Sequence, residues 1–309
     1  MVSTPPDGPQ GPAASPGPTD PHAPTDPVTM PPTPPTDHST PPSAAPPAAA
    51  PAPAPAAVQA VLPALVPIAA DAPRHPGTDR PLLTQSWLDL TFLHWPADPA
   101  DVAPLLPPGT TPDTLDGVTY VGLVAFRMHR VGWLRLPGIP YLGSFPETNV
   151  RLYSVDHHGR RGVVFRSLDA SRLLPVLPVL AARTLFRLPY QWSRMSVRRN
   201  GTTLTYTSRR RWPGPRGAHS TLTVRTGEPV REPTALEHFL TARWGLHSDF
   251  AGRLLYLPNS HPRWPLQRAE LLHCDEDLVA AAGLPAPAGP PASVLYSSGV
   301  PVRFTRPNG

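Results

Sequence analysis

The sequence contains no lysine, and all 27 of its basic residues are arginine. Lysine can be tuned to a neutral amine near working pH, whereas a guanidinium, with a pKa above about 12, stays charged. Apart from the α-amine at the start of the chain, no amine nucleophile is present. This absence excludes catalysis through an imine formed on a side chain.

Cysteine is nearly absent as well, since Cys274 is the single one. No intramolecular disulfide and no cysteine-based metal cluster can form. The tandem His157-His158 lies in a predicted surface turn, where adjacent side chains diverge and do not readily share a metal. The GxGxxG, Walker, HExxH, GxSxG and CxxC motifs are also missing. We therefore predict neither a metal nor a cofactor, and without a recognisable export signal we expect a cytoplasmic location.

The first 80 residues lack Phe, Trp and Tyr but hold 24 of the 50 prolines. Such a segment cannot bury enough apolar surface to offset its chain entropy. We predict that residues 1–80 form a disordered Pro/Ala-rich tail and that residues 81–309 form a single domain. The apolar run 57–70 is too short and too rich in proline for a membrane span.

The two parts also differ in charge. The tail has six Asp against two Arg, a net charge of −4, and the remainder has 25 Arg against 16 acids, a net charge of +9. A basic domain favours anionic ligands or nucleic acid. We interpret the basic run SRRRW (208–212) as a solvated strand tip, because no motif typical of RNA or DNA binding accompanies it. Neither a specific nucleic-acid partner nor a membrane partner is expected.

Alternating apolar and polar residues predict an α+β fold that is mainly antiparallel β. Strands are expected at 85–95 and 117–131, on both sides of the turn DHHGRR, in a meander turning at Asn200-Gly201, and in GRLLYLP, PLQRAELLHC and SVLYSSGVPVRF. Short helices are expected at 98–106, 178–186, 233–244 and 275–284. Many antiparallel strands with few helices imply a closed or strongly curved sheet.

The alternation within the first strand places Trp87, Asp89, Thr91, Leu93 and Trp95 on one face. His94 then faces the opposite side, and we interpret it as a core or rim histidine.

The stretch FPETNVRLY (145–153) places polar residues at alternate positions. Glu147, Asn149 and Arg151 therefore share one face of a predicted strand. Glu147 and Arg151 are roughly 13 Å apart along that strand, too far to pair but able to bracket a small polar molecule. The partner strand GVVFRSLDA adds Asp169. The residues leave two interpretations open: a solvent-exposed face with cross-strand ion pairs, or the wall of a pocket.

Six segments occur in the order FLHWP, ETNVRLY, GRRGVVFRSLDA, AARTLFRLPY, FLTARW and HPRWPL. In this order they resemble the bacterial YqjF-like family, which is placed with the acetoacetate-decarboxylase-like fold. The resemblance spans roughly residues 82–305 and implies a β-cone or barrel whose interior holds the site. Glu147 matches a glutamate of the decarboxylases. The segment where those enzymes carry the Schiff-base lysine reads Ser167, Leu168, Asp169 and Ala170 here, so the resemblance implies a pocket without imine chemistry.

The same motifs add two candidates, Arg183 in AARTLF and Tyr190 in LPY. A structural role suits each equally well: an arginine stem covering apolar surface, or a tyrosine hydroxyl bonded to the backbone.

The leading hypothesis is a pocket for a small carboxylate- or carbonyl-bearing molecule. Arg151 and Arg183 would hold an anionic group through forked hydrogen bonds. Glu147 would act as the acid or base if a reaction occurs, because burial raises a carboxyl pKa. Asn149 and Asp169 would orient the ligand.

Two alternatives stay open. The first is a non-enzymatic ligand-binding or regulatory module that uses the same pocket. The second is an interaction protein that uses its basic surface or its Pro-rich tail.

Overall fold

A computed structural model describes residues 67–72, 81–133, 143–172 and 187–307. The chain divides into two units, Met1–Gln59 and Ala60–Gly309, and every described residue belongs to the second. Most of the predicted tail, the helix predicted at 178–186 and the candidate Arg183 lie outside the described residues.

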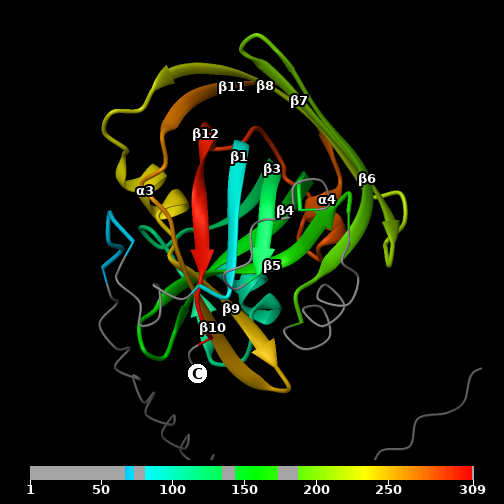
Figure 1. The fold of residues 1–309 in the computed structure, drawn as a ribbon. Coiled ribbons are helices and arrows are strands. Elements are labelled where there is room, and N and C mark those ends of the chain that lie inside the picture. Colours follow the sequence, from blue (N-terminus) through cyan, green and yellow to red (C-terminus); the bar gives the residue numbers. More distant parts are fainter. Residues whose placement is uncertain (1–66, 73–80, 134–142, 173–186, 308–309) are drawn as a thin grey trace, which may run out of the picture. The chain divides into compact units, whose positions relative to one another are not determined.

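The described part of the second unit is built mainly from strands (Figure 1). They are β1 (Leu83–Ala97), β2 (Thr110–Pro112), β3 (Thr119–Trp133), β4 (Phe145–Asp156), β5 (Arg161–Ala170), β6 (Tyr190–Asn200), β7 (Thr203–Trp212), β8 (His219–Pro229), β9 (Gly245–Phe250), β10 (Arg253–Ser260), β11 (Leu266–Glu276) and β12 (Ser293–Phe304). The helices are α1 (Pro99–Val102), the 3-10 turn η1 (Ala103–Leu105), α3 (Ala235–Thr241) and α4 (Leu278–Ala281).

The sheet closes on itself in two circuits. Its strand order, β10-β9-β5-β6-β7-β8-β11-β12-β1-β3-β4-β2, is completed by the pairings β5–β4 and β10–β12. One circuit runs through nine strands, from β12, β1, β3, β4 and β5 to β6, β7, β8 and β11. A second circuit shares β12, β1, β3, β4 and β5 and returns through β9 and β10. Among the described pairings, only β5–β6 and β5–β9 are parallel. The predicted closed and mainly antiparallel sheet is confirmed.

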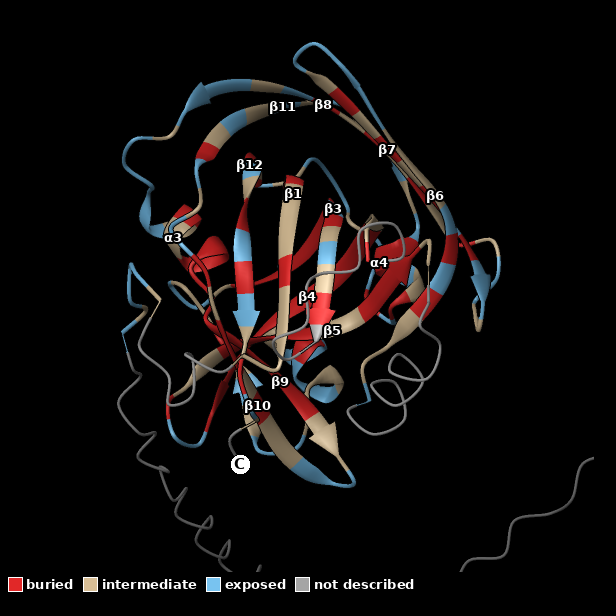
Figure 2. Cartoon of the chain, viewed as in Figure 1, coloured by how far each residue is buried: buried red, intermediate tan, exposed pale blue. Residues whose placement is uncertain are grey.

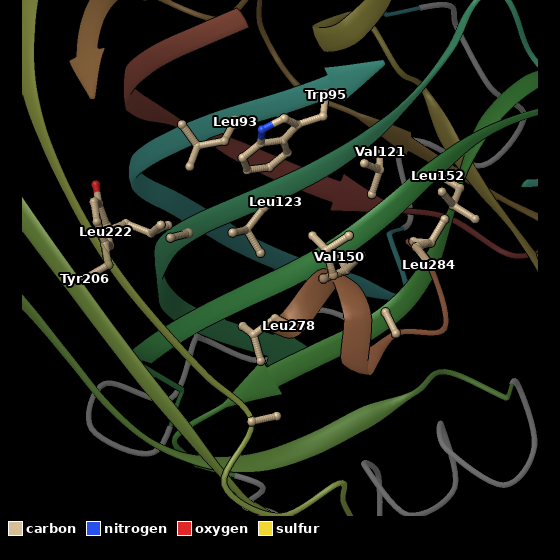
Figure 3. Close-up of a cluster of buried hydrophobic side chains, with 14 of the residues drawn as sticks. Leu93, Trp95, Val121, Leu123, Val150, Leu152, Tyr206, Leu222, Leu278 and Leu284 are labelled. Carbon is tan, nitrogen blue, oxygen red and sulfur yellow. The ribbon is translucent and has the colours of Figure 1, made fainter. Parts of the chain in front are cut away.

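The nine-strand circuit encloses a hydrophobic core around α4. In Figure 1, β6, β7, β8 and β11 arch around the shared strands, and α4 lies between the two groups. Leu278 of α4 belongs to one cluster of buried side chains with Leu93, Leu123, Val150 and Leu222, all of them fully buried (Figure 3). This core covers one face of β1, β3 and β4.

The other face of these strands is buried too. Strand β4 is buried from Glu147 to its end at Asp156, and it is coloured red over most of its length in Figure 2. A strand buried on both faces is unusual in an antiparallel sheet, where one side normally meets water. A second layer therefore faces β4 across the seven-strand circuit.

The helices α1, α3 and α4 lie inside their predicted segments but are shorter. Helix α3 begins at a capping box, in which the Thr234 side chain accepts from the Glu237 backbone and the Glu237 carboxylate accepts from the Thr234 backbone. It ends after seven residues, and the chain continues into β9, a strand that the sequence did not indicate. No helix of the described ranges is long and apolar enough to cross a membrane.

Strand β1 changes face at Asp89, so the predicted single face is wrong. The register against β3 shifts between Leu88 and Thr91, and Asp89 has φ +50°. Trp87 consequently lines a cavity, whereas Trp95 belongs to the core around α4. A bulge of this kind adds a residue and reverses the alternation beyond it.

A short segment before the first strand lies against the domain. The carbonyl groups of Ile68 and Ala69 accept hydrogen bonds from the side chains of His238, at 3.0 Å, and Trp244, at 2.9 Å. Residues 67–72 therefore contact the domain, although they precede residue 81, where the sequence places its start.

Candidate functional site

A cavity of about 240 Å³ lies inside the seven-strand circuit, and each of its strands contributes lining residues. The lining is mostly apolar, and eight of the residues are aromatic. Trp87 and Trp264 stack with their ring centroids 6.0 Å apart, and Phe92 meets Trp264 edge-on at 5.4 Å. Small-molecule sites typically have such apolar walls with a few polar groups among them.

Three of those polar groups come from β4. Glu147, Asn149 and Arg151 line the cavity, while Val150 and Leu152 point into the core around α4. The period of two along a strand places alternate side chains on one face. The structure therefore brings together the three residues that the alternation grouped, and the face they share borders a cavity rather than solvent.

Glu147 is 4% exposed, and burial raises its pKa to about 8. A hydrogen bond with Asn149 acts in the opposite direction, and the negative charge of Asp169 raises the pKa further. At neutral pH the carboxyl group is therefore mostly protonated and can donate a hydrogen bond. Among the described residues, its Oε2 atom has no hydrogen-bond partner.

Arg151 is 9% exposed and is held in place by hydrogen bonds. Its Nη2 donates to the Leu240 carbonyl at 2.9 Å, and its Nε donates to the Tyr153 hydroxyl at 3.2 Å. The guanidinium also lies 5.5 Å from the ring centre of Phe92. No carboxylate of the described residues forms an ion pair with it, so a positive charge borders the cavity without an acidic partner.

Two residues support Arg151 from behind. Tyr153 donates its hydroxyl proton to the Leu240 carbonyl at 2.9 Å, and His94 Nε2 lies 2.6 Å from the same hydroxyl. Burial, with the charges of Arg151 and Arg243, holds the pKa of His94 well below its usual value. A neutral His94 with its proton on Nε2 completes the network by donating to Tyr153. The sequence predicted a core or rim position for His94, and the structure buries it, but the sequence did not reveal its hydrogen bond with Tyr153.

Further arginines lie near this network. Asp113 forms ion pairs with both Arg161 and Arg243, so one carboxylate serves two guanidinium groups. The Arg243 guanidinium lies 4.7 Å from the ring centre of Tyr153. The charges around Arg151 are therefore net positive, which favours an anion in the cavity.

Asp169 lies on the other side of the sheet. Its backbone pairs with Thr148, and its carboxylate accepts from Arg210 Nε at 2.9 Å, Arg210 Nη2 at 2.6 Å and Ser193 at 2.7 Å. This placement corrects the expectation that Asp169 orients a ligand beside Asn149. The interpretation of SRRRW as a solvated strand tip holds for Arg209, Arg211 and Trp212, which are exposed, but not for Arg210, which is 2% exposed.

The remaining candidates are placed as follows. Tyr190, at the start of β6, lines the cavity, and burial together with the charge of Glu147 raises the pKa of its hydroxyl. His157 and His158 are exposed in the turn between β4 and β5, as predicted. In the part of the chain that the structure describes, no group of three His, Cys, Asp or Glu side chains is arranged to hold a metal ion.

Comparisons with known proteins place the chain in a family. The family model DUF2071, described as "Uncharacterized conserved protein", matches residues 84–301. The "Uncharacterized protein YqjF" of Bacillus subtilis (strain 168) is 32% identical over 210 residues, which cover 68% of this chain and 85% of YqjF. The chain belongs to the DUF2071 family. The YqjF-like resemblance of the six sequence segments is thereby confirmed.

Similarity to solved structures lies in the fold. The enduracididine biosynthesis enzyme MppR, complexed with pyruvate, gives a TM-score of 0.51 at 13% identity, covering 74% of this chain and 90% of MppR. An acetoacetate decarboxylase-like enzyme from Sphingomonas wittichii RW1 gives a TM-score of 0.48 at 14% identity, covering 72% of this chain and 92% of that one. This member of the DUF2071 family thus shares the fold of MppR.

Proposed function

We propose that the cavity binds a small carboxylate- or carbonyl-bearing molecule and that Arg151 holds its anionic group. The observation that carries this proposal is the buried guanidinium of Arg151, which borders the cavity and has no ion-pair partner among the described residues. A buried charge is costly unless it is paired. A ligand carboxylate supplies that pair through two parallel hydrogen bonds.

Glu147 supplies the second polar contact. As a neutral carboxylic acid it donates a hydrogen bond to a carbonyl or hydroxyl oxygen, and a pKa of about 8 suits proton transfer near neutral pH. Glu147 is therefore the acid/base candidate in an enzymatic version of this function. Asn149 lies between Glu147 and Arg151 on the strand and orients the ligand.

The chemistry differs from that of an imine-forming decarboxylase. The chain has no lysine. The resemblance implies that Ser167, Leu168, Asp169 and Ala170 occupy the place of the decarboxylase lysines. Pyruvate, the molecule bound in MppR, is a small keto acid and agrees in chemical class with the proposed ligand. A non-enzymatic binding module with the same contacts is the alternative, and a turnover assay on any ligand found separates the two.

The test is a thermal-shift screen of small carboxylic acids on the wild type and on Arg151→Gln. We expect the ligands that bind to lose at least tenfold in affinity in this variant, because one buried charge-assisted hydrogen bond contributes about 1.5–3 kcal/mol. Arg198→Gln removes the same charge from an exposed position on β6 and serves as the matched control. Equal affinities in a folded Arg151→Gln variant would refute the proposal.

A further inference from the structure

Two buried oxygen atoms lie together on the cavity wall without a hydrogen-bond partner among the described residues. They are Oε2 of Glu147 and Oδ1 of Asn149, and their residues are 4% and 5% exposed. The two residues are alternate positions of β4, so their side chains project from the same face into the cavity. Buried polar atoms usually have a partner, and because these two belong to residues that line the cavity, a ligand atom can supply it.

The two oxygen atoms need different hydrogen-bond partners. The protonated carboxyl group of Glu147 donates a hydrogen bond, whereas the amide oxygen of Asn149 only accepts one. A ligand hydroxyl group satisfies both, because it accepts from Glu147 and donates to Asn149. A ketone oxygen satisfies Glu147 alone and leaves the Asn149 oxygen unpaired.

The space around these groups is apolar and aromatic. Phe92 and Trp264 form an edge-to-face pair on the cavity wall, and Phe126 and Phe165 are also among the eight aromatic residues that line it. Flat rings pack well against such walls through offset and edge-to-face contacts. Such a wall suits an apolar ligand body, and an aromatic ring in particular.

The strand sets the distance between the two polar ends. Asn149 and Arg151 are alternate residues of β4, so their Cα atoms are roughly 7 Å apart. A benzene ring with one short substituent spans a gap of this order. The carboxylate at one end of such a molecule reaches Arg151 while a hydroxyl at the other end meets Asn149.

Building on the proposed function, we infer that the ligand is a hydroxylated carboxylic acid with a ring-sized apolar body, of which the phenolic acids are the simplest examples. Its carboxylate pairs with Arg151, its ring lies against the aromatic wall, and its hydroxyl bridges Glu147 and Asn149. This inference selects a hydroxy acid over a keto acid and a ring over a two- or three-carbon chain.

Calorimetric titration of the full chain with four probes tests the inference. We expect 4-hydroxyphenylacetate to bind most tightly. Phenylacetate, which lacks the hydroxyl, should bind about tenfold more weakly, and tyrosol, which lacks the carboxylate, at least tenfold more weakly. Acetoacetate, which has neither ring nor hydroxyl, should be the weakest of the acids.

Two variants assign each preference to its residue. Asn149→Leu keeps the shape of the side chain but removes its acceptor, so the preference for 4-hydroxyphenylacetate over phenylacetate should shrink to about twofold or less. Arg151→Gln should remove the preference for 4-hydroxyphenylacetate over tyrosol and leave the hydroxyl preference in place. Such crossed losses separate the two contacts even when each variant changes overall stability.

The outcomes distinguish the inference from the proposed function. If the wild type binds phenylacetate as tightly as 4-hydroxyphenylacetate, or binds acetoacetate more tightly than both, the inference is wrong while an Arg151-dependent acid site stands. If no acid binds, or if binding of every acid is unchanged in Arg151→Gln, the proposed function fails as well.

Discussion

Glu147 and Asp169 show how two carboxyl groups on neighbouring strands reach different states. Asp169 is paired through two hydrogen bonds with Arg210, so its charge is compensated inside the domain. Glu147 faces the cavity without a basic partner among the described residues, and burial keeps it neutral. The difference follows from what lies opposite each side chain and not from the residue type.

Glu147 should make stability depend on pH. Its pKa is about 8 in the folded protein against an ordinary value of 4.5, so its contribution to stability is fully present below pH 4.5 and is lost as pH rises through 8. Within that window the unfolded chain releases the proton while the folded protein keeps it. The unfolding free energy should fall by about 1.4 kcal/mol per pH unit from this group.

Glu147→Gln cannot ionise and should lose that slope. Urea denaturation of both proteins between pH 4 and 9 measures the difference in unfolding free energy, in which all other titrating groups cancel. The unfolding free energy of the variant should rise steadily relative to that of the wild type as the pH increases to 8. A constant difference across the range would show that Glu147 is ionised in the folded protein.

Asp169→Ala should destabilise the domain strongly. The change leaves the Arg210 guanidinium, which is 2% exposed, without its carboxylate. Breaking a buried ion pair by removing one partner costs about 3–5 kcal/mol. Chemical denaturation gives the value, and Glu270→Ala is the matched control, because it breaks an exposed pair with Arg225 that contributes about 0–1 kcal/mol. Similar losses in both variants would contradict the prediction.

Strand β1 is the element whose shape departs most from its sequence pattern. Its bulge at Asp89 is held by Arg127, Arg199 and the Tyr296 hydroxyl, which all bond to the Asp89 carboxylate. Because the bulge reverses the alternation, Trp87 joins the cavity wall while Trp95 enters the other core. Strand β1 thereby contributes a tryptophan to the cavity of one circuit and another to the hydrophobic core of the other.

Gly299→Ala should disrupt this element. Gly299 pairs with Leu88 beside the bulge and has φ +123°, and an added Cβ atom would lie 2.1 Å from the Trp87 carbonyl oxygen. We expect a loss of at least about 2 kcal/mol in unfolding free energy, because both the backbone conformation and the space oppose a side chain. Gly289→Ala is the control, since an added Cβ there meets nothing within 4 Å. A loss no larger than that of the control would mean that the bulge rearranges freely.

Residues 67–72 should add measurable stability. A chain that begins at residue 81 loses the hydrogen bonds from His238 and Trp244 to this segment, together with the packing of Ile68. Its melting temperature should lie about 2–6 °C below that of a chain beginning at residue 60. Equal melting temperatures would show that the segment contributes nothing, and failure of the shorter chain to fold would show that it is required.

At the scale of the whole molecule, the two closed circuits of strands have different contents. The nine-strand circuit is filled by α4 and its hydrophobic core, whereas the seven-strand circuit holds the cavity. The shared strands are therefore stabilised from one side and present polar groups on the other. A rigid sheet of this kind can position buried polar groups for a ligand.

The absence of lysine should be visible in a trapping experiment. Borohydride added with acetoacetate should leave no covalent adduct in residues 81–309, because these contain no amine side chain that can form an imine. Peptide mass spectrometry measures this, with a lysine-dependent decarboxylase treated in parallel as the positive control. A reducible adduct within these residues would overturn the argument.

Much of the site could be predicted from local pattern. Glu147, Asn149 and Arg151 share a face because side chains alternate along any strand, and the structure keeps them together. The face occupied by Asp169 could not be predicted, because it depends on the register between β4 and β5, and a shift of one residue moves a side chain to the other side. The pairing of Asp169 with Arg210, 41 residues away, depends on the meander folding back.

The sequence by itself determined the lack of an amine nucleophile, the alternation that groups the polar residues of β4, and the net charge of the domain, because these need only composition and the geometry of one strand. The tertiary structure decided which face of β4 borders a cavity, which charges are compensated, and that Arg151 is left without a carboxylate among the described residues. Those outcomes depend on contacts between distant segments, as when Arg243 binds Asp113 across 130 residues. Chain closure brings such segments together, and no local pattern encodes the result.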